Sequence, residues 1–431
     1  MERAENPWHL RPFFGRTPVL PAEARRVLLL VAFGLFFENY DMGLINAALP
    51  QITDELGIGA GQTGFYLGAI RLGGIGAFLL LPFADRLGRR QLFIASFIGM
   101  SVGTLGTALC QTPLQFVFAQ VVARVFMLTA AALAVVIVIE EFPAAQRGGG
   151  LGLLGLLGGL GYGACAGLYS LVDVIPFGWR GLYFIGVMPL LAVSFIRRTL
   201  RETRRFDVHR AGEQAGEAQP SGMEAWLAPM RALMRTNPRR TIAVGVAAFF
   251  GAAGSISFYQ YTSYFTTNVH DWTPADYSIL VIMGGTIGVF GSVLGGRGSD
   301  RFGRRVVGFV GMGLSPVFIY VFFNGPEHVL IWSWGLVVFF GSAGDLVLRA
   351  LSAELFPTSH RGTSTGWMIL VQTFGWTAGL VLVGFGTESI ADLSRVVPLV
   401  AVGMLVGAIA LLTIPETGGR ELETISAEPS P

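Results

Sequence analysis

The sequence predicts an all-α integral membrane protein with twelve transmembrane helices, and three observations lead to that prediction. First, 52% of the 431 residues are apolar and only 13% are charged, whereas a soluble chain carries about 25% charged residues. Second, the apolar residues form long runs, and one membrane crossing needs about 20 of them. Third, the runs fall into two groups of six. This composition excludes a disordered chain, a coiled coil, a disulfide-rich scaffold and a nucleic-acid-binding protein.

Polar joints between the apolar runs give the expected helices and domains. The expected spans are 27–49, 61–83, 91–110, 114–139, 150–171, 181–198, 240–266, 277–296, 306–324, 328–351, 363–386 and 396–414. They predict a cytoplasmic N-terminal tail (1–26), an N-terminal six-helix bundle (27–198), a cytoplasmic linker (199–239), a C-terminal six-helix bundle (240–414) and a cytoplasmic tail (415–431). In the linker, Ser221 and Glu224 form a capping box before a one-sided apolar stretch, which predicts a surface helix.

The positions of the arginines predict the orientation. All 30 basic side chains other than histidine are arginine, and they cluster at the N-terminus and at every even-to-odd joint, whereas the opposite joints hold only Arg180 and Arg395. Because cytoplasmic loops are enriched in basic residues, we expect a multi-pass protein of the cell inner (plasma) membrane with both termini in the cytoplasm. Cys110 and Cys165 lie in apolar runs and predict neither a disulfide nor a metal site.

An internal repeat is visible in three motifs that recur in the same order at a nearly constant separation. Asp85-Arg86-Leu87-Gly88-Arg89-Arg90 returns as Asp300-Arg301-Phe302-Gly303-Arg304-Arg305, Glu140-x-Phe142-Pro143-x-x-x-Arg147-Gly148 returns as Glu354-x-Phe356-Pro357-x-x-x-Arg361-Gly362, and Glu202-Thr203 returns as Glu416-Thr417. Such a pattern indicates a duplicated six-helix unit. Both copies start on the same side of the membrane, so the repeat is parallel.

With these motifs the sequence resembles the major facilitator superfamily. The Asp-Arg-x-Gly-Arg-Arg joint is that superfamily's most recognisable motif, and the Glu-x-Phe-Pro joints with the ending at 415–423 resemble its branch of sugar porters and metabolite–proton symporters. Two departures stand out: Leu81 replaces the glycine that usually opens the first joint, and the glycine-rich pattern of span 4 survives only as Arg124. The resemblance implies two six-helix bundles around a cavity that opens alternately to each side.

Charged residues inside the spans are the candidate functional residues, because a charge at the bilayer centre costs about 2.5–3.5 kcal/mol on insertion scales. A rise of about 1.5 Å per residue places Asp41, Arg71 and Arg124 near the midplane. Glu38 lies one turn deeper, and its spacing of three residues from Asp41 puts both acids on one helix face. We therefore expect two acids and two arginines to meet in the N-terminal half.

The acids predict proton coupling, since a carboxylate held in a partly dry cavity can exchange a proton near neutral pH. The candidates are Glu38, Asp41 and Asp345, the last with Arg349 one turn on as its natural partner. The stretch from residue 37 to 41, Phe-Glu-Asn-Tyr-Asp, resembles a signature of aromatic-acid and other metabolite–proton symporters. The resemblance thus implies that the coupling ion is the proton.

The arginines predict a substrate site, because a guanidinium offers a fork of donors suited to a carboxylate. Spans 7 and 11 add side chains that can hydrogen-bond a small polar ligand. The alternative is that the charges only fix helix packing and that the tyrosines anchor a helix at the membrane interface. The expected substrate-binding residues are Arg71, Arg124, Tyr259, Gln260, Tyr264, Gln372 and Trp376.

The charged cytoplasmic joints predict a gate. Ion pairs are expected there either between the halves or within each half, and they would stabilise the state that is closed on the cytoplasmic side. The alternative is that the arginines set topology and bind anionic lipid headgroups. The expected gate residues are Asp85, Arg86, Arg89, Arg90, Glu140, Glu141, Arg147, Asp300, Arg301, Arg304, Arg305, Glu354 and Arg361.

Together these features predict a secondary active transporter, a proton-coupled symporter for uptake of a small organic anion such as a carboxylate metabolite. Symport of a neutral sugar or polyol and efflux antiport are the alternatives. A non-transporting receptor on this fold is a further one. No phosphate-binding loop, HExxH or GxSxG motif suggests an enzyme. The expected partners are the small-molecule substrate and the lipid bilayer, with no nucleic acid, no cofactor and a monomeric state.

Overall fold

The computed structural model describes residues 22–81, 83–142, 147–200, 202, 230–235, 237–356 and 361–418. Within this part of the chain, twelve helical segments are long and apolar enough to cross a membrane. The predicted all-α membrane fold is therefore confirmed. Most of the linker, including the capping box at Ser221 and Glu224, lies outside the described residues, and so do most of the two tails.

Three of the six spans in the N-terminal half, the first, second and sixth, consist of more than one helix. This half consists of α2 (Ala22–Ala47) with α3 (Leu49–Glu55), α4 (Ala60–Arg71) with α5 (Gly73–Leu80), the short α6 (Phe83–Leu87), α7 (Arg89–Leu109), α8 (Pro113–Glu141), α9 (Arg147–Tyr169), and α10 (Trp179–Gly186) with α11 (Pro189–Thr199). Pro189 at the start of α11 explains the break in the sixth span, since proline removes a helix hydrogen bond.

The C-terminal half consists of longer, continuous helices. They are α14 (Pro238–His270), α15 (Pro274–Phe302), α16 (Arg304–Asn324), α17 (Glu327–Glu354), α18 (Arg361–Gly386), the short 3₁₀ helix η3 (Ile390–Asp392) and α19 (Leu393–Leu412). Local sequence signals explain where several of these helices begin. Thr273, for example, caps α15 by accepting a hydrogen bond from the Asp276 N–H, with Pro274 in the first turn. This is a strong start signal for a helix.

The glycine of the repeated Asp-Arg-x-Gly-Arg-Arg motif has the same backbone conformation in both copies. Gly88 and Gly303 have φ values of 98° and 97°, which side chains with a Cβ rarely adopt. Each glycine separates two helices, so that α7 and α16 begin on the next residue. The motif therefore fixes a tight turn at equivalent places in the two halves.

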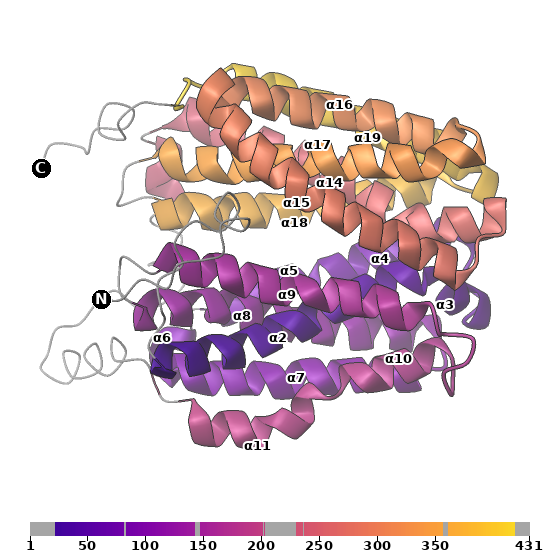
Figure 1. Ribbon diagram of the computed structural model, residues 1–431, viewed down its shortest axis with the longest axis horizontal. Helices are drawn as coiled ribbons and strands as arrows, with labels where there is room; N and C mark the ends of the chain where they lie inside the picture. The colour runs from indigo at the N-terminus through magenta and orange to yellow at the C-terminus, as the bar shows by residue number, and fades with distance from the viewer. Residues whose placement is uncertain are drawn as a thin grey trace, which may run out of the picture.

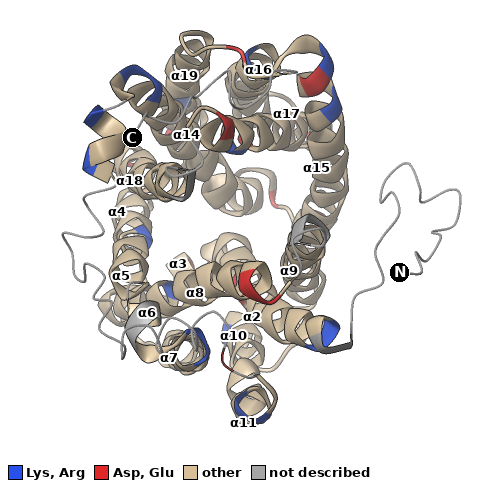
Figure 2. Ribbon diagram, turned by 90° about the vertical axis from the view of Figure 1, so that its left-hand side faces the viewer, with Lys and Arg blue, Asp and Glu red and all other residues tan. Residues whose placement is uncertain are grey.

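The two halves lie side by side with both ends of the described chain at one end of the bundle (Figure 1). Viewed from that end, helices of both halves form a ring (Figure 2). The most extensive contacts between the halves are those of α4 with α18 and of α9 with α15, and α14 also packs against α2 and α3. The end that carries the termini is called the terminus side below.

The halves are sealed together at the end opposite the termini. Gly64 of α4 lies so close to α18 that a Cβ at this position would overlap the carbonyl oxygen of Leu380. Nearby, Ser263 of α14 donates a hydrogen bond to the carbonyl oxygen of Ala47 at 2.6 Å. We call these contacts, between α4 and α18 and between α14 and the end of α2, the distal seal.

We expect Gly64→Ala to open the distal seal, because the added methyl group overlaps the backbone of α18 and such overpacking costs about 1–3 kcal/mol. The measurement is the labelling rate of Ser263→Cys by a membrane-impermeant maleimide applied from the side opposite the termini. Native Cys110 and Cys165 are buried, so background labelling is low. Gly167→Ala is the control, because a Cβ there meets nothing within 4 Å. Equal labelling of parent and Gly64→Ala would contradict this account of the seal.

Candidate functional site

Three buried charged residues of the N-terminal half lie together near the middle of the bundle. Glu38 and Asp41 on α2 and Arg124 on α8 are only 8%, 4% and 5% exposed. Arg124 interacts electrostatically with both carboxylates, and Thr104 of α7 donates a hydrogen bond to Asp41 at 3.4 Å. The spacing of the two acids puts both on one face of α2, which is why a single arginine serves the two.

A second arginine approaches the same point. Nη1 of Arg124 donates to Sδ of Met42 at 2.9 Å, and Nη1 of Arg71, which is 4% exposed, donates to the same sulfur at 3.5 Å. A thioether is a weak acceptor. In addition, Nε and Nη2 of Arg124 are buried without a hydrogen-bond partner. Two guanidinium groups therefore face a poor acceptor in a place where a carboxylate or another strong acceptor would bind well.

Gln260 of α14 holds Arg71 in position across the boundary between the halves. Nη2 of Arg71 donates to Oε1 of Gln260 at 2.9 Å, and Nε2 of Gln260 donates to the carbonyl oxygen of Ile45 at 3.3 Å. Gln260 is fully buried, so these bonds form away from bulk water. They link α4, α14 and α2 and direct the remaining donors of Arg71 towards Met42.

Arg71 lines a cavity of about 350 Å³ on the terminus side of the distal seal, which we call the arginine cavity. Its walls come from both halves and are rich in aromatic side chains, as is usual for ligand pockets. The lining residues are Met42, Asn46, Arg71, Tyr162, Ser255, Ile256, Tyr259, Val281, Gly284, Gly285, Trp334, Val338 and Trp376.

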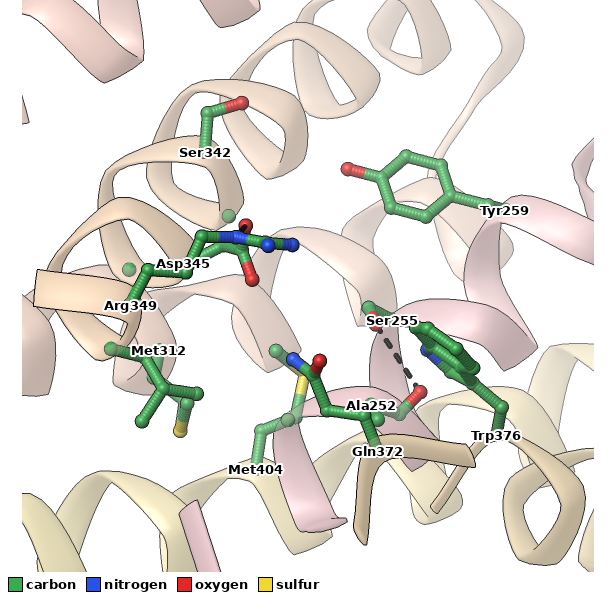
Figure 3. A pocket seen from close by; sticks show the side chains of 14 residues that line it. Ala252, Ser255, Tyr259, Met312, Ser342, Asp345, Arg349, Gln372, Trp376 and Met404 are labelled. Carbon is green, nitrogen blue, oxygen red and sulfur yellow. Dashed lines mark hydrogen bonds and ion pairs between the residues drawn. The ribbon is translucent and has the colours of Figure 1, made fainter. Parts of the chain in front are cut away.

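A second cavity, of about 260 Å³, lies next to the first and nearer the terminus side; we call it the Asp345 cavity. It shares Ser255, Tyr259 and Trp376 with the arginine cavity. Asp345 and Arg349, one turn apart on α17, form an ion pair of 2.7 Å, and their side chains are 46% and 57% exposed. Figure 3 shows this pair on one wall. The expected pairing is therefore present, in a wet place where it contributes little to stability.

Some of the expected substrate-binding residues line the two cavities, and others lie outside them. Tyr259 and Trp376 line both cavities, Arg71 lines the arginine cavity, and Gln372 lines the Asp345 cavity. Arg124 and Gln260 are buried near Arg71 and do not belong to the lining of either of these two cavities. Tyr264 packs against Tyr261, with ring centroids 6.4 Å apart, outside the lining of these two cavities. A substrate role for each of these seven residues stays a prediction.

Most of the residues that line the arginine cavity were missed by sequence reasoning, and Tyr162 and Trp334 illustrate two different cases. Tyr162 is the one phenol in the Gly- and Leu-rich stretch 148–167. Its hydroxyl group, in an otherwise apolar span, could have identified it from the sequence. Trp334 offered no such signal, because Trp332 stands two residues earlier. Only the packing separates them: Trp334 is 4% exposed and Trp332 is 70% exposed.

Charges of the repeated motifs pair within each half. Arg89 forms an ion pair with Glu140 at 3.5 Å in the N-terminal half, and Arg304 pairs with Glu354 at 2.6 Å in the C-terminal half. Arg304 also approaches Asp300 at 3.4 Å. This is the second of the two arrangements expected from the sequence, and a gating role stays a prediction. Outside the described side chains lie those of Asp85, Arg86, Arg147 and Arg361.

The third repeated motif places a carboxylate at the start of a membrane helix in each half. Glu416 accepts hydrogen bonds from the backbone N–H groups of Arg304 at 2.7 Å and Arg305 at 3.1 Å. Glu202 likewise accepts from the N–H of Arg90 at 3.1 Å. A negative charge is favourable at a helix N-terminus. Each glutamate therefore ties the end of its half to the first turn of that half's third helix.

We expect Glu416→Gln to lower the thermal unfolding midpoint at neutral pH. Partial burial acts to raise the pKa of Glu416, but the N–H groups of Gly418, Arg304 and Arg305 outweigh it and hold the pKa below its usual value. A lowered pKa means that the stabilisation is present above the pKa of an unfolded glutamate, about 4.3. It is lost as the pH falls through the folded-state pKa.

The difference in unfolding midpoint between parent and Glu416→Gln should therefore persist from about pH 7 to pH 5 and shrink below about pH 4. Thermal unfolding in detergent measures it. The exposed Glu388 provides the control, because Glu388→Gln changes the same charge without removing backbone hydrogen bonds to Glu416. A variant midpoint equal to that of the parent at pH 7 would refute a stabilising role.

Comparison with known proteins identifies the family to which the chain is similar. The sequence profile of the Major Facilitator Superfamily matches residues 31–306 and 271–430. The chain is 25% identical over 391 residues to the D-xylose transporter of Levilactobacillus brevis, covering 81% of this chain and 82% of that protein. It is 22% identical over 388 residues to the gallate transporter of Pseudomonas putida, covering 83% and 84%.

The fold has a close counterpart among solved structures. The inward open conformation of the xylose transporter XylE from E. coli superimposes with a TM-score of 0.72 at 17% identity, covering 93% of this chain and 99% of that chain. At this identity the likeness concerns the fold. The all-α membrane fold built from two repeats, implied by the sequence motifs, is therefore confirmed.

Proposed function

We propose that this chain, which belongs to the major facilitator superfamily of transporters, takes up a small organic anion together with a proton. The observation that carries the proposal is the approach of Arg71 and Arg124 to the sulfur of Met42. A carboxylate accepts charge-assisted hydrogen bonds that are roughly twice as strong as neutral ones. An anion that enters the arginine cavity and displaces Met42 would therefore bind the two guanidinium groups more strongly than the sulfur does.

Charge balance then explains why a proton accompanies the anion. With both acids ionised, the two negative charges of Glu38 and Asp41 balance the two positive charges of Arg71 and Arg124. A bound carboxylate adds one negative charge, and an uncompensated charge at membrane depth costs about 2.5–3.5 kcal/mol. One proton on either acid restores neutrality. The cluster thus favours one proton for each monovalent anion.

Arg124 connects the two events. It interacts with both carboxylates and also reaches Met42, one residue from Asp41. When the substrate attracts Arg124, the two acids lose part of their counter-charge and bind a proton more readily. Conversely, loss of that proton draws Arg124 back to the acids and weakens the hold on the substrate. Binding of the anion and of the proton are therefore mutually favourable.

The relatives support two substrate classes. The gallate transporter of Pseudomonas putida is named for an organic anion, as the arginines here favour. The D-xylose transporter of Levilactobacillus brevis is named for a neutral sugar, which makes neutral sugar symport the second candidate. A neutral solute adds no charge to the site and needs no proton for charge balance. Uptake of gallate and of D-xylose into proteoliposomes, with and without a pH gradient, distinguishes the two.

The proposed direction of transport depends on which side of the membrane the arginine-rich terminus side faces. If both termini lie in the cytoplasm, as the arginine distribution favours, the distal seal closes the outer side and both cavities face the cytoplasm. The Asp345 cavity is then the exit path. Its half-exposed ion pair is a neutral unit that the departing anion and proton pass last.

Asp41→Asn is expected to abolish accumulation of the anion driven by a pH gradient, because an amide cannot exchange the proton. Exchange of labelled for unlabelled substrate should persist, since the amide imitates the protonated acid. Proteoliposomes with an alkaline interior measure both activities. Asp54→Asn, at an exposed position of α3, is the control and should accumulate substrate normally. Accumulation by Asp41→Asn at the parental level would remove Asp41 from the coupling site.

Arg71→Lys should raise the half-saturation concentration of the anion by about tenfold to a hundredfold, because loss of a charged hydrogen bond costs about 1.5–3 kcal/mol. Lysine keeps the charge but cannot bond Gln260 and the substrate with one planar fork. Initial uptake rates measure the effect, and the exposed Arg395→Lys serves as control. If the half-saturation concentration stays unchanged, Arg71 only supports packing.

A further inference from the structure

Met42 on α2 has a partly exposed side chain, and its sulfur faces two charged donors. Nη1 of Arg124 and Nη1 of Arg71 both donate to Sδ, at 2.9 Å and 3.5 Å. The side chain is neither fully buried nor fully exposed, and it belongs to the lining of the arginine cavity. Met100 and Met127, by contrast, are only 1% exposed in the core of the same half. Met42 therefore combines access from the cavity with a strongly polar surrounding.

A thioether that a peroxide can reach is open to oxidation. A lone pair of the sulfur attacks one oxygen of hydrogen peroxide, the O–O bond breaks, and the proton on the transferred oxygen passes to the leaving hydroxide. The products are methionine sulfoxide and water, so the sulfur loses the two electrons that the peroxide gains. A thioether is a weak acceptor, whereas the sulfoxide is polar. Oxidation of Met42 would therefore replace a poor acceptor by a good one.

The two adjoining cavities give a small oxidant a route to this sulfur. The arginine cavity, of about 350 Å³, shares Ser255, Tyr259 and Trp376 with the Asp345 cavity. The ion pair on the wall of that second cavity is about half exposed. Water, and a molecule as small as hydrogen peroxide, can therefore approach from the terminus side without passing the distal seal.

We propose that Met42 is an oxidation site, and that the oxygen of its sulfoxide binds Arg71 and Arg124 and thereby blocks the anion site. Charged donors form the stronger hydrogen bonds to oxygen. Nε and Nη2 of Arg124, which have no hydrogen-bond partner among the described residues, add further donors close by. The same guanidinium groups stabilise the negative charge that develops as the oxygen is transferred.

This inference rests on the proposed anion transport and adds a way in which that transport is switched off. The sulfoxide oxygen and the carboxylate of the substrate compete for the same two guanidinium groups. Oxidation should therefore raise the half-saturation concentration of the anion. A methionine that only fills space beside a cavity predicts no such selective effect.

The test treats the full-length protein in proteoliposomes with dilute hydrogen peroxide and follows Met42 and uptake together. The tryptic peptide 27–71 contains Met42 as its only methionine and neither cysteine nor tryptophan. A mass gain of one oxygen atom in this peptide therefore reports oxidation of Met42. Gallate, benzoate and lactate are the transported probes. As the peptide is oxidised, the half-saturation concentration should rise at least about tenfold, which corresponds to about 1.4 kcal/mol.

Occupation of the site provides a second readout. An acid that is transported should slow the oxidation of Met42 when it is present at saturating concentration, because it fills the cavity in front of the sulfur. The same acid should leave the oxidation of Met283 unchanged, since this residue of α15 is 41% exposed and lies outside the lining of the arginine cavity.

Variants separate the effect of the added oxygen from the loss of the methionine. Met42→Leu has no sulfur, so peroxide should change its half-saturation concentration by less than about twofold. Met42→Gln offers an amide oxygen near the place of the sulfoxide oxygen. It should resemble the oxidised parent before treatment and respond little to peroxide. Met283→Leu is the control and should remain as sensitive as the parent.

Three outcomes would overturn the inference and leave anion transport standing. The first is full oxidation of the peptide with an unchanged half-saturation concentration. The second is a peptide that stays unoxidised while Met283 is oxidised, since peroxide then does not reach the sulfur. The third is an equal loss in Met42→Leu, which would place the sensitive group elsewhere. If the untreated protein transports none of the three acids, anion transport fails, and the inference fails with it.

Discussion

Arg124 brings a positive charge into helices surrounded by hydrocarbon, and Glu38 and Asp41 offset that charge within the same half. An isolated charge at this depth is costly, so the arginine is stabilised by the two acids beside it. Arg71, which lines the arginine cavity, approaches the same Met42 sulfur as Arg124. In the proposed mechanism a charged ligand changes the charge balance of this cluster, and a proton compensates for it.

The contacts that close the bundle are of a kind that can be broken. Gly64 lets the backbones of α4 and α18 touch, and one hydrogen bond from Ser263 joins α14 to the end of α2. Small residues allow close packing of membrane helices without interlocking long side chains. By contrast, Glu202 and Glu416 bind helix starts within their own halves. Strong polar contacts thus stabilise each half internally, whereas the contacts of the distal seal between the halves rest on small residues and few hydrogen bonds.

Much of the fold could be predicted because apolar run length controls membrane crossing. The fourth span was expected at 114–139 and is found as Pro113–Glu141. The meeting of Asp41, Arg71 and Arg124 could be predicted too, since depth follows from the rise per residue. Met42 as the shared acceptor could not, nor could Trp334. Both depend on how far each helix is rotated about its axis, and contacts between helices distant in the sequence determine that rotation.

Duplication makes the halves alike at their ends and unlike at their centre. Gly88 and Gly303 form the same turn, but the buried acids belong to the N-terminal half, whereas Trp334 and its aromatic neighbours belong to the C-terminal half. A ligand bound to Arg71 in the arginine cavity would thus contact both halves, because Gln260 of α14 holds Arg71 and both halves line the cavity. Its binding energy would act on the surface that must open and close. A ligand can shift a conformational balance only through such differential contacts, and the arginine cavity lies where one small molecule can provide them.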